Sequence, residues 1–69
     1  MRNDIFLKQM GNQMRTIRKS KNVTLRQLGE MCNLDYSAIA RIECGKKSAR
    51  ILSLKVIADK LEVDVKDFF

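Results

Sequence analysis

Apolar residues recur at intervals of three and four along this chain, and that helical period is the feature that most limits its possible folds. The first series, Phe6, Met10, Met14 and Ile17, steps by four, four and three, so its members share one face of a helix. That helix should end near residues 19–22, where the sequence turns polar. Val, Ile and Thr are scattered without strand-like alternation, and the chain has no proline. The sequence therefore predicts an all-α fold.

A capping pattern marks the start of a second helix. Thr24 is followed three residues later by Gln27, which is the S/T-x-x-E/Q arrangement of a capping box, and Leu28 and Cys32 continue the apolar period. Asn33 comes next, and asparagine tolerates the left-handed backbone that stops a helix. We expect a helix of about nine residues followed by a sharp turn.

Two more helices and a short final turn follow. Asp35 or its neighbour can cap a third helix with Ile39 and Ile42 facing inward, and Gly45 ends it. A basic loop then leads into a fourth amphipathic helix, whose apolar positions are Ile51, Leu54, Ile57, Ala58 and Leu61. Asp64 can cap a last short turn. The expected fold is thus a five-helix all-α domain.

The length of 69 residues suffices for one domain, so we expect residues 1–69 to fold as a single unit. At this size, stability without disulfides or metal relies on close helix packing or on a partner subunit. Cys32 and Cys44 are expected to be reduced thiols, and two cysteines with no histidine do not complete a zinc site. We expect no metal and no cofactor.

No apolar stretch approaches a membrane span, and the N-terminus lacks a signal-peptide core, so we expect a cytoplasmic protein that does not enter a membrane. Catalytic chemistry also lacks candidates. There is no histidine, no glycine-rich phosphate loop and no recognisable pairing of nucleophile and base. We therefore expect a binding protein rather than an enzyme, and no small-molecule site.

The net charge of +6 is unevenly distributed. The basic excess lies in residues 1–50, whereas residues 51–69 are slightly acidic. This distribution suggests that one end faces a polyanion and the other faces something else. Charge alone fits a merely soluble basic protein equally well.

The most specific pattern lies in residues 24–47. Two helices joined by about four residues, the second short and polar on its outward face, are the sequence form of a helix-turn-helix. The segment reads TLRQLGEMCNLDYSAIARIECGKK and resembles the phage Cro/repressor-type (XRE) helix-turn-helix family from about Met10 to the end. The matching features are Gly29 at the helix crossing, Leu34 after the turn, the Ile39/Ile42 pair and the Glu43-x-Gly45-Lys46 ending.

The resemblance implies a lambda-repressor-like domain with its helix-turn-helix at about residues 24–44, acting as a sequence-specific transcriptional regulator on double-stranded DNA. It also implies a structural ion pair between Arg18 and Glu43. The sequence departs from the family pattern at Leu25, Asn33, Ala49, Tyr36 and Ser37. Leu25 replaces a glutamine that often contacts phosphate, and the last two open the recognition helix. The operator sequence therefore does not carry over.

In this geometry the third helix lies in the major groove. The expected base contacts are Tyr36, Ser37, Ala38, Ala40 and Arg41. Arg41 is the first candidate for reading guanine, because its fork meets O6 and N7 together, with a phosphate contact as the alternative. Tyr36 has two further interpretations, a phosphate contact or a cover for the helix start. The expected phosphate contacts flank the helix and are Thr24, Arg26, Lys46, Lys47 and Arg50.

One helix-turn-helix of this size contacts only a few base pairs. We therefore expect a homodimer on a palindrome with half-sites about 34 Å apart. We expect its interface in residues 51–69, whose surplus apolar side chains are Leu52, Val56, Val63, Val65, Phe68 and Phe69. The alternative is that Phe68 caps the monomer core and Leu52 is an isolated exposed residue.

Stand-alone relatives of this size include restriction–modification controller proteins and small phage-type repressors, and the sequence is similar to both. The competing function is an antitoxin-like protein-interaction module that binds DNA only weakly. RNA binding is a weaker third, because the chain has one tyrosine and no interleaved aromatic residues for stacking bases. A further alternative is that this is the DNA-binding piece of a longer protein.

Overall fold

The computed structural model describes residues 2–69, with side chains from residue 5 onward. The elements are α1 (Arg2–Ser20), α2 (Leu25–Cys32), α3 (Tyr36–Glu43), α4 (Ile51–Leu61) and a 3-10 turn, η1 (Val65–Phe68). Residues 2–69 contain no strand, so the all-α prediction is confirmed. The count of five α-helices is not met, because the fifth element is a four-residue 3-10 turn, a geometry that rarely extends further.

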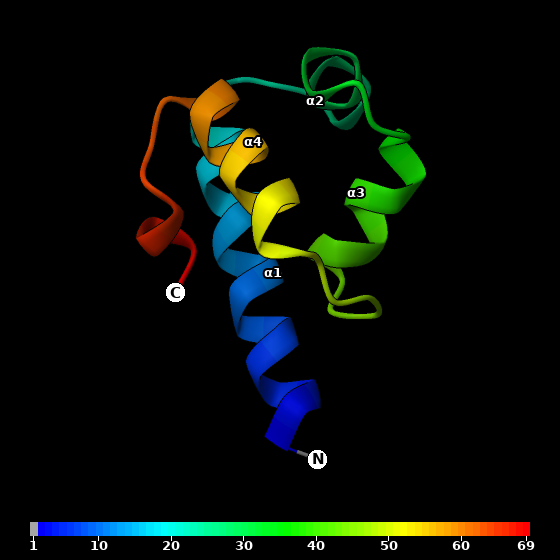
Figure 1. The fold of residues 1–69 in the computed structure, drawn as a ribbon, viewed down its shortest axis with the longest axis vertical. Helices are drawn as coiled ribbons and strands as arrows, with labels where there is room; N and C mark the ends of the chain where they lie inside the picture. Colours follow the sequence, from blue (N-terminus) through cyan, green and yellow to red (C-terminus); the bar gives the residue numbers. More distant parts are fainter. Residues whose placement is uncertain (1) are drawn as a thin grey trace.

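The helices are arranged around α1, which runs along the long axis of the molecule (Figure 1). α3 packs against α1 and α2, α4 packs against α2, and η1 lies against both α1 and α4. Each element supplies side chains to one core, which contains Met10, Met14, Leu28, Cys32, Ile39, Ile42, Leu54, Ile57, Ala58, Leu61 and Phe68. The core thus holds the helix-turn-helix, α2 and α3, against the rest of the chain.

The apolar face predicted for the first helix is only partly buried. Met10 and Met14 lie in the core and Ile17 packs at its edge, but Phe6 is 53% exposed. The N-terminal turns of α1 extend beyond the other helices (Figure 1). The Phe6 ring stacks on Phe69, with 5.7 Å between the ring centroids. The amphipathic pattern therefore continues beyond the core that it helps to form.

Each of the four described α-helices is followed within two residues by one in the left-handed conformation, and these are Asn22, Asn33, Gly45 and Glu62. In each case the next residue donates its N–H to a carbonyl in the helix, as Leu34 does to Gly29 at 2.8 Å. This is the Schellman arrangement, which satisfies the last carbonyls of a helix. Asn33 and Gly45 were expected to act as stops, and the structure confirms both.

Gly11, in the middle of α1, lets that helix cross the end of α3 at backbone contact. A methyl group at this position would overlap the carbonyl oxygen of Ile42 and lie 2.7 Å from that of Glu43. The obstructing atoms belong to the backbone, so they yield only if the helices separate. Sequence reasoning did not identify this residue.

Candidate nucleic-acid interface

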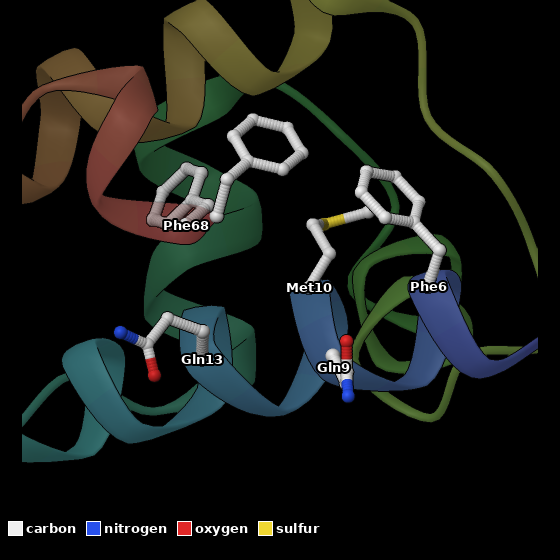
Figure 2. Close-up of a pocket in the computed structure, with 6 residues that line it drawn as sticks. Phe6, Gln9, Met10, Gln13 and Phe68 are labelled. Carbon is white, nitrogen blue, oxygen red and sulfur yellow. The ribbon is translucent and has the colours of Figure 1, made fainter.

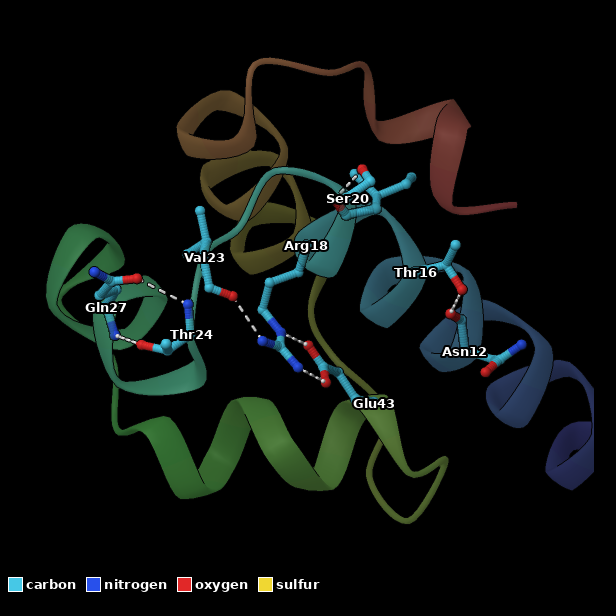
Figure 3. Close-up of polar contacts among 9 residues, drawn as sticks. Asn12, Thr16, Arg18, Ser20, Val23, Thr24, Gln27 and Glu43 are labelled. Atoms are coloured by element: carbon cyan, nitrogen blue, oxygen red, sulfur yellow. Dashed lines mark hydrogen bonds and ion pairs between the residues drawn. The ribbon is translucent and has the colours of Figure 1, made fainter.

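The C-terminal end of α3 is fixed by a buried ion pair with α1 (Figure 3). Arg18 Nε donates to Glu43 Oε2 at 2.7 Å, and Arg18 Nη2 donates to Glu43 Oε1 at 3.1 Å. Arg18 Nη1 also donates to the carbonyl of Val23 at 2.7 Å, which ties in the loop before α2. The pair implied by the family resemblance is therefore present.

Burial makes this pair sensitive to the loss of either partner. The two side chains are only 7% and 4% exposed, so each charge depends on the other for the stabilisation that water would provide. The two parallel hydrogen bonds also fix the relative orientation of the groups. The ion pair thus fixes the C-terminal end of α3 relative to α1.

A reciprocal cap holds the start of α2. The Gln27 N–H donates to Thr24 Oγ1 at 3.0 Å, and the Thr24 N–H donates to Gln27 Oε1 at 2.9 Å (Figure 3). This is the capping box that the sequence predicted. Because Thr24 Oγ1 accepts a hydrogen bond, its own O–H remains free to donate outward.

The turn between α2 and α3 is tight. A methyl group on Gly29 would lie 2.8 Å from the carbonyl oxygen of Leu34 and 3.2 Å from the nitrogen of Tyr36. The small residue expected at the helix crossing is thus required there. Asp35 occupies the N-cap of α3 with an extended backbone, but its side chain makes no capping hydrogen bond.

The residues predicted to contact bases are only partly on the outward side of α3. Tyr36, Ser37 and Arg41 are exposed, whereas Ala38 and Ala40 are half-buried. Ser37 and Arg41 lie one turn apart on the helix surface. This side of α3 is polar and basic.

The residues predicted to contact phosphate surround α3 and are all exposed. Thr24 and Arg26 lie at the start of α2, Lys46 and Lys47 follow α3, and Arg50 is the N-cap of α4. The guanidinium carbon of Arg26 lies 5.1 Å from the ring centroid of Tyr36, a contact that the sequence did not indicate.

The surface predicted for dimerisation divides in two. Leu52 is 74% and Val56 39% exposed on α4. Together with Cys32, Leu34 and Ser53 they line a hollow of about 150 Å³, and we call this area the α4 surface.

The second area, the phenylalanine surface, is centred on Phe6 and Phe69. It borders a cavity of about 280 Å³ that Gln9, Met10, Gln13 and Phe68 also line (Figure 2). The α4 surface and this cavity share no lining residue.

One predicted interface position, Phe68, needs correction, and two others are only partly exposed. Phe68 is fully buried in the monomer core, and Val63 and Val65 are half-buried and pack against it. The 3-10 turn directs Phe68 inward, so its ring is not available to a partner. Of the six predicted residues, Leu52, Val56 and Phe69 are exposed.

The two cysteines are free thiols in different surroundings. Burial raises the pKa of the Cys32 thiol, and nearby Lys60 opposes this with a smaller effect. Cys32 therefore stays protonated and unreactive at neutral pH. Cys44 is exposed at the end of α3.

Within the described residues, no group of three or more His, Cys, Asp and Glu side chains could hold a metal ion. None of the described helices combines the length and apolar character that crossing a membrane requires.

Residues 14–68 match a family model described as helix-turn-helix. A comparison with curated proteins finds no match. Among solved structures, the chain is similar to the restriction-modification controller protein C.AhdI from Aeromonas hydrophila, with a TM-score of 0.91 and 22% identity over 94% of this chain and 98% of that one. At that identity, the likeness shows the fold alone.

Two further structures are also similar. An HTH_3 family transcriptional regulator from Vibrio cholerae has a TM-score of 0.89 and 30% identity, and the match covers 97% of this chain and 38% of that one. The clp gene regulator ClgR from Corynebacterium glutamicum has a TM-score of 0.85 and 28% identity, and the match covers 88% of this chain and 78% of that one.

Proposed function

Because the chain belongs to the helix-turn-helix family whose model matches residues 14–68, we propose that it is a sequence-specific transcriptional regulator of double-stranded DNA. α3 enters the major groove of a palindromic operator, and α2 crosses the backbone. Two of the similar solved structures are regulators by name, which agrees with this proposal.

One observation carries the proposal, namely the way α3 is held. Its end is fixed by the buried Arg18–Glu43 pair, while its outward side chains, including Ser37 and Arg41, make no part of the core. A helix with this anchoring presents side chains at fixed positions, as reading base edges requires. The cations around it supply the sequence-independent attraction to phosphate.

The proposed homodimer uses the α4 surface. Leu52 is exposed and helps to line the hollow, so a two-fold axis that passes beside the hollow would place each Leu52 near the hollow of the partner. Residues 51–69 lack the basic excess of the rest of the chain, so two copies meet there without strong repulsion.

The test of DNA recognition is selection of bound sequences from a random duplex pool, followed by salt titration on the winner and on a scrambled control. We expect a palindrome with half-sites about one helical turn apart. The affinity should fall steeply with salt on both duplexes, because several phosphates are neutralised. Failure to enrich any sequence would contradict the proposal.

The test of the dimer compares two matched variants. Leu52→Glu should shift the protein to monomer in sedimentation equilibrium, whereas Phe69→Glu should leave the dimer intact. The reverse result would move the interface to the phenylalanine surface. A wild-type protein that is monomeric at every concentration would remove the dimer from the proposal.

One observation favours a second function, that of an antitoxin-like interaction module. Phe6 and Phe69 are more than half exposed beside a cavity, and isolated monomers rarely leave such a cluster uncovered without a role. This alternative predicts weak DNA binding of equal strength on the selected and scrambled duplexes, which the salt titration above would reveal.

A further inference from the structure

A cation–π contact joins the two helices of the helix-turn-helix at the edge of the proposed DNA surface. The Arg26 guanidinium carbon lies 5.1 Å from the centroid of the Tyr36 ring. A guanidinium within about 6 Å of an aromatic ring is attracted by the negative face of that ring. Arg26 lies in the first turn of α2, and Tyr36 is the first residue of α3. The contact therefore links two side chains that the proposed function assigns to the same ligand.

The backbone sets the position of the ring. Gly29 follows Arg26 by three residues, so both lie on the same side of α2. A methyl group on Gly29 would lie 3.2 Å from the nitrogen and 3.3 Å from the Cα of Tyr36, so the start of α3 abuts α2 one turn away from Arg26. The tight turn thus brings Tyr36 to Arg26 before any ligand binds.

Arg26 forms no ion pair with the carboxylates beside it. Glu30 and Asp35 line the same open hollow of about 600 Å³ as Arg26 and Tyr36. Among these described side chains, no ion pair joins Arg26 to Glu30 or to Asp35. The guanidinium donors lie in the plane of the group, so a ring that contacts its face leaves its N–H edge available.

We propose that Tyr36 is a positioning residue for Arg26, and that the two bind DNA as one unit. The ring holds the guanidinium so that its N–H edge meets a phosphate next to the first turn of α3. This inference rests on the proposed function in taking DNA as the ligand. If the two residues instead contacted DNA independently, removing Tyr36 would have the same effect with or without Arg26. In the proposed unit, the contribution of Tyr36 to binding depends on the presence of Arg26.

The experiment is a double-mutant cycle on binding to the selected duplex and to the scrambled control, with the affinities compared at one salt concentration and the wild type and Arg26→Ala also titrated with salt. Arg26→Ala and Tyr36→Leu should each weaken binding by about three- to tenfold, and the double variant should be no weaker than Arg26→Ala alone. Tyr36→Phe keeps the ring and should bind within about twofold of wild type. Arg26→Ala should also reduce the salt slope by about one.

The matched control pairs Tyr36→Leu with Arg50→Ala, whose exposed cation lies at the start of α4. Those two losses should multiply. Multiplying losses for Tyr36 and Arg26 would overturn the proposal. So would a Tyr36→Phe variant as weak as Tyr36→Leu, because the hydroxyl and not the ring would then act.

The two duplexes separate this inference from the proposed function. A phosphate contact is independent of sequence, so the coupling should appear on both duplexes. Coupling confined to the selected duplex would overturn the assignment to phosphate. A wild-type protein that binds both duplexes equally would instead contradict sequence-specific recognition, while the coupling between Tyr36 and Arg26 would still be measured.

Discussion

Both ends of α3 lie in close backbone contact with a neighbouring helix, but the side chains at the two ends have opposite surroundings. At the C-terminal end, Glu43 is buried in a two-bond ion pair with Arg18, and the backbone lies against α1 at Gly11. At the N-terminal end, the side chain of Tyr36 is exposed, and Asp35 makes no capping hydrogen bond through its side chain. One end supplies rigidity and the other presents chemistry to solvent.

This difference indicates how a short helix can recognise a ligand without destabilising the fold. The Arg18–Glu43 pair and the crossing at Gly11 involve buried groups, so they do not constrain which residues occupy the exposed positions of α3. Changes to the buried contacts of α3 should therefore alter the free energy of unfolding. Changes to its exposed side chains should alter binding.

The largest effect is expected from Glu43→Gln. Removing the carboxylate leaves the Arg18 guanidinium buried without a counter-charge, which should lower the free energy of unfolding by about 3–5 kcal/mol in urea denaturation. The matched control is Asp59→Asn, which breaks the Lys55–Asp59 pair, whose side chains are 62% and 60% exposed. It should cost less than about 1 kcal/mol. If both variants lost the same free energy of unfolding, the buried Arg18–Glu43 pair would contribute no more to stability than an exposed ion pair.

Gly11→Ala should come next. The added methyl group meets the backbone of Ile42 and Glu43, so α1 and α3 must separate, at a cost of about 1–3 kcal/mol in the same assay. Asn12→Ala, at the neighbouring exposed position, is the control and should be close to neutral. A stabilised Gly11→Ala variant would show that the crossing of α1 and α3 has room for a methyl group. The higher helix propensity of alanine would then determine the change in stability.

Most features of the helix-turn-helix could be predicted from the sequence. The capping box at Thr24 and the left-handed stops at Asn33 and Gly45 were predicted, because each depends on residues close together in the chain. The resemblance to a family supplied the close approach at Gly29 and the Arg18–Glu43 pair. Local chemistry and a known pattern therefore accounted for most of the helix-turn-helix.

The missing parts depend on contacts between distant segments. Gly11 reads in the sequence only as a weak helix former, since nothing nearby indicates that α3 crosses there. Phe68 and Phe69 are neighbours of the same type, yet one is fully buried and the other 58% exposed. Which of the two is buried depends on how the 3-10 turn packs against α1 and α4. The spacing of apolar residues in the sequence does not predict that packing.

A smaller effect should distinguish the two N-caps. Thr24→Ala removes one half of the capping box on α2 and should cost about 1 kcal/mol of unfolding free energy. Asp35→Ala removes no hydrogen bond from the side chain at the start of α3 and should cost less than about 0.5 kcal/mol. Thermal unfolding of both variants in one buffer measures the difference. A costly Asp35→Ala would mean that the exposed end is anchored as well.

The smallest change in stability is expected for Arg41→Ala, within about 0.5 kcal/mol, because the side chain is exposed. Its effect on DNA should be large by comparison. Binding to the selected duplex should weaken more than binding to the scrambled one, by a factor of about 5 to 150. Equal losses on both duplexes, measured by fluorescence anisotropy, would assign Arg41 to a phosphate and leave base reading to Ser37 and its neighbours.

The end of α4 bears on how this protein can change during evolution. Glu62 has a φ of 62°, a conformation that costs a side-chain-bearing residue about 1–2 kcal/mol and glycine almost nothing. Glycine at position 62 should therefore stabilise the fold, and this position lies outside the helix-turn-helix. A lineage that acquired glycine at this position could tolerate destabilising substitutions along α3 while it explored new operators.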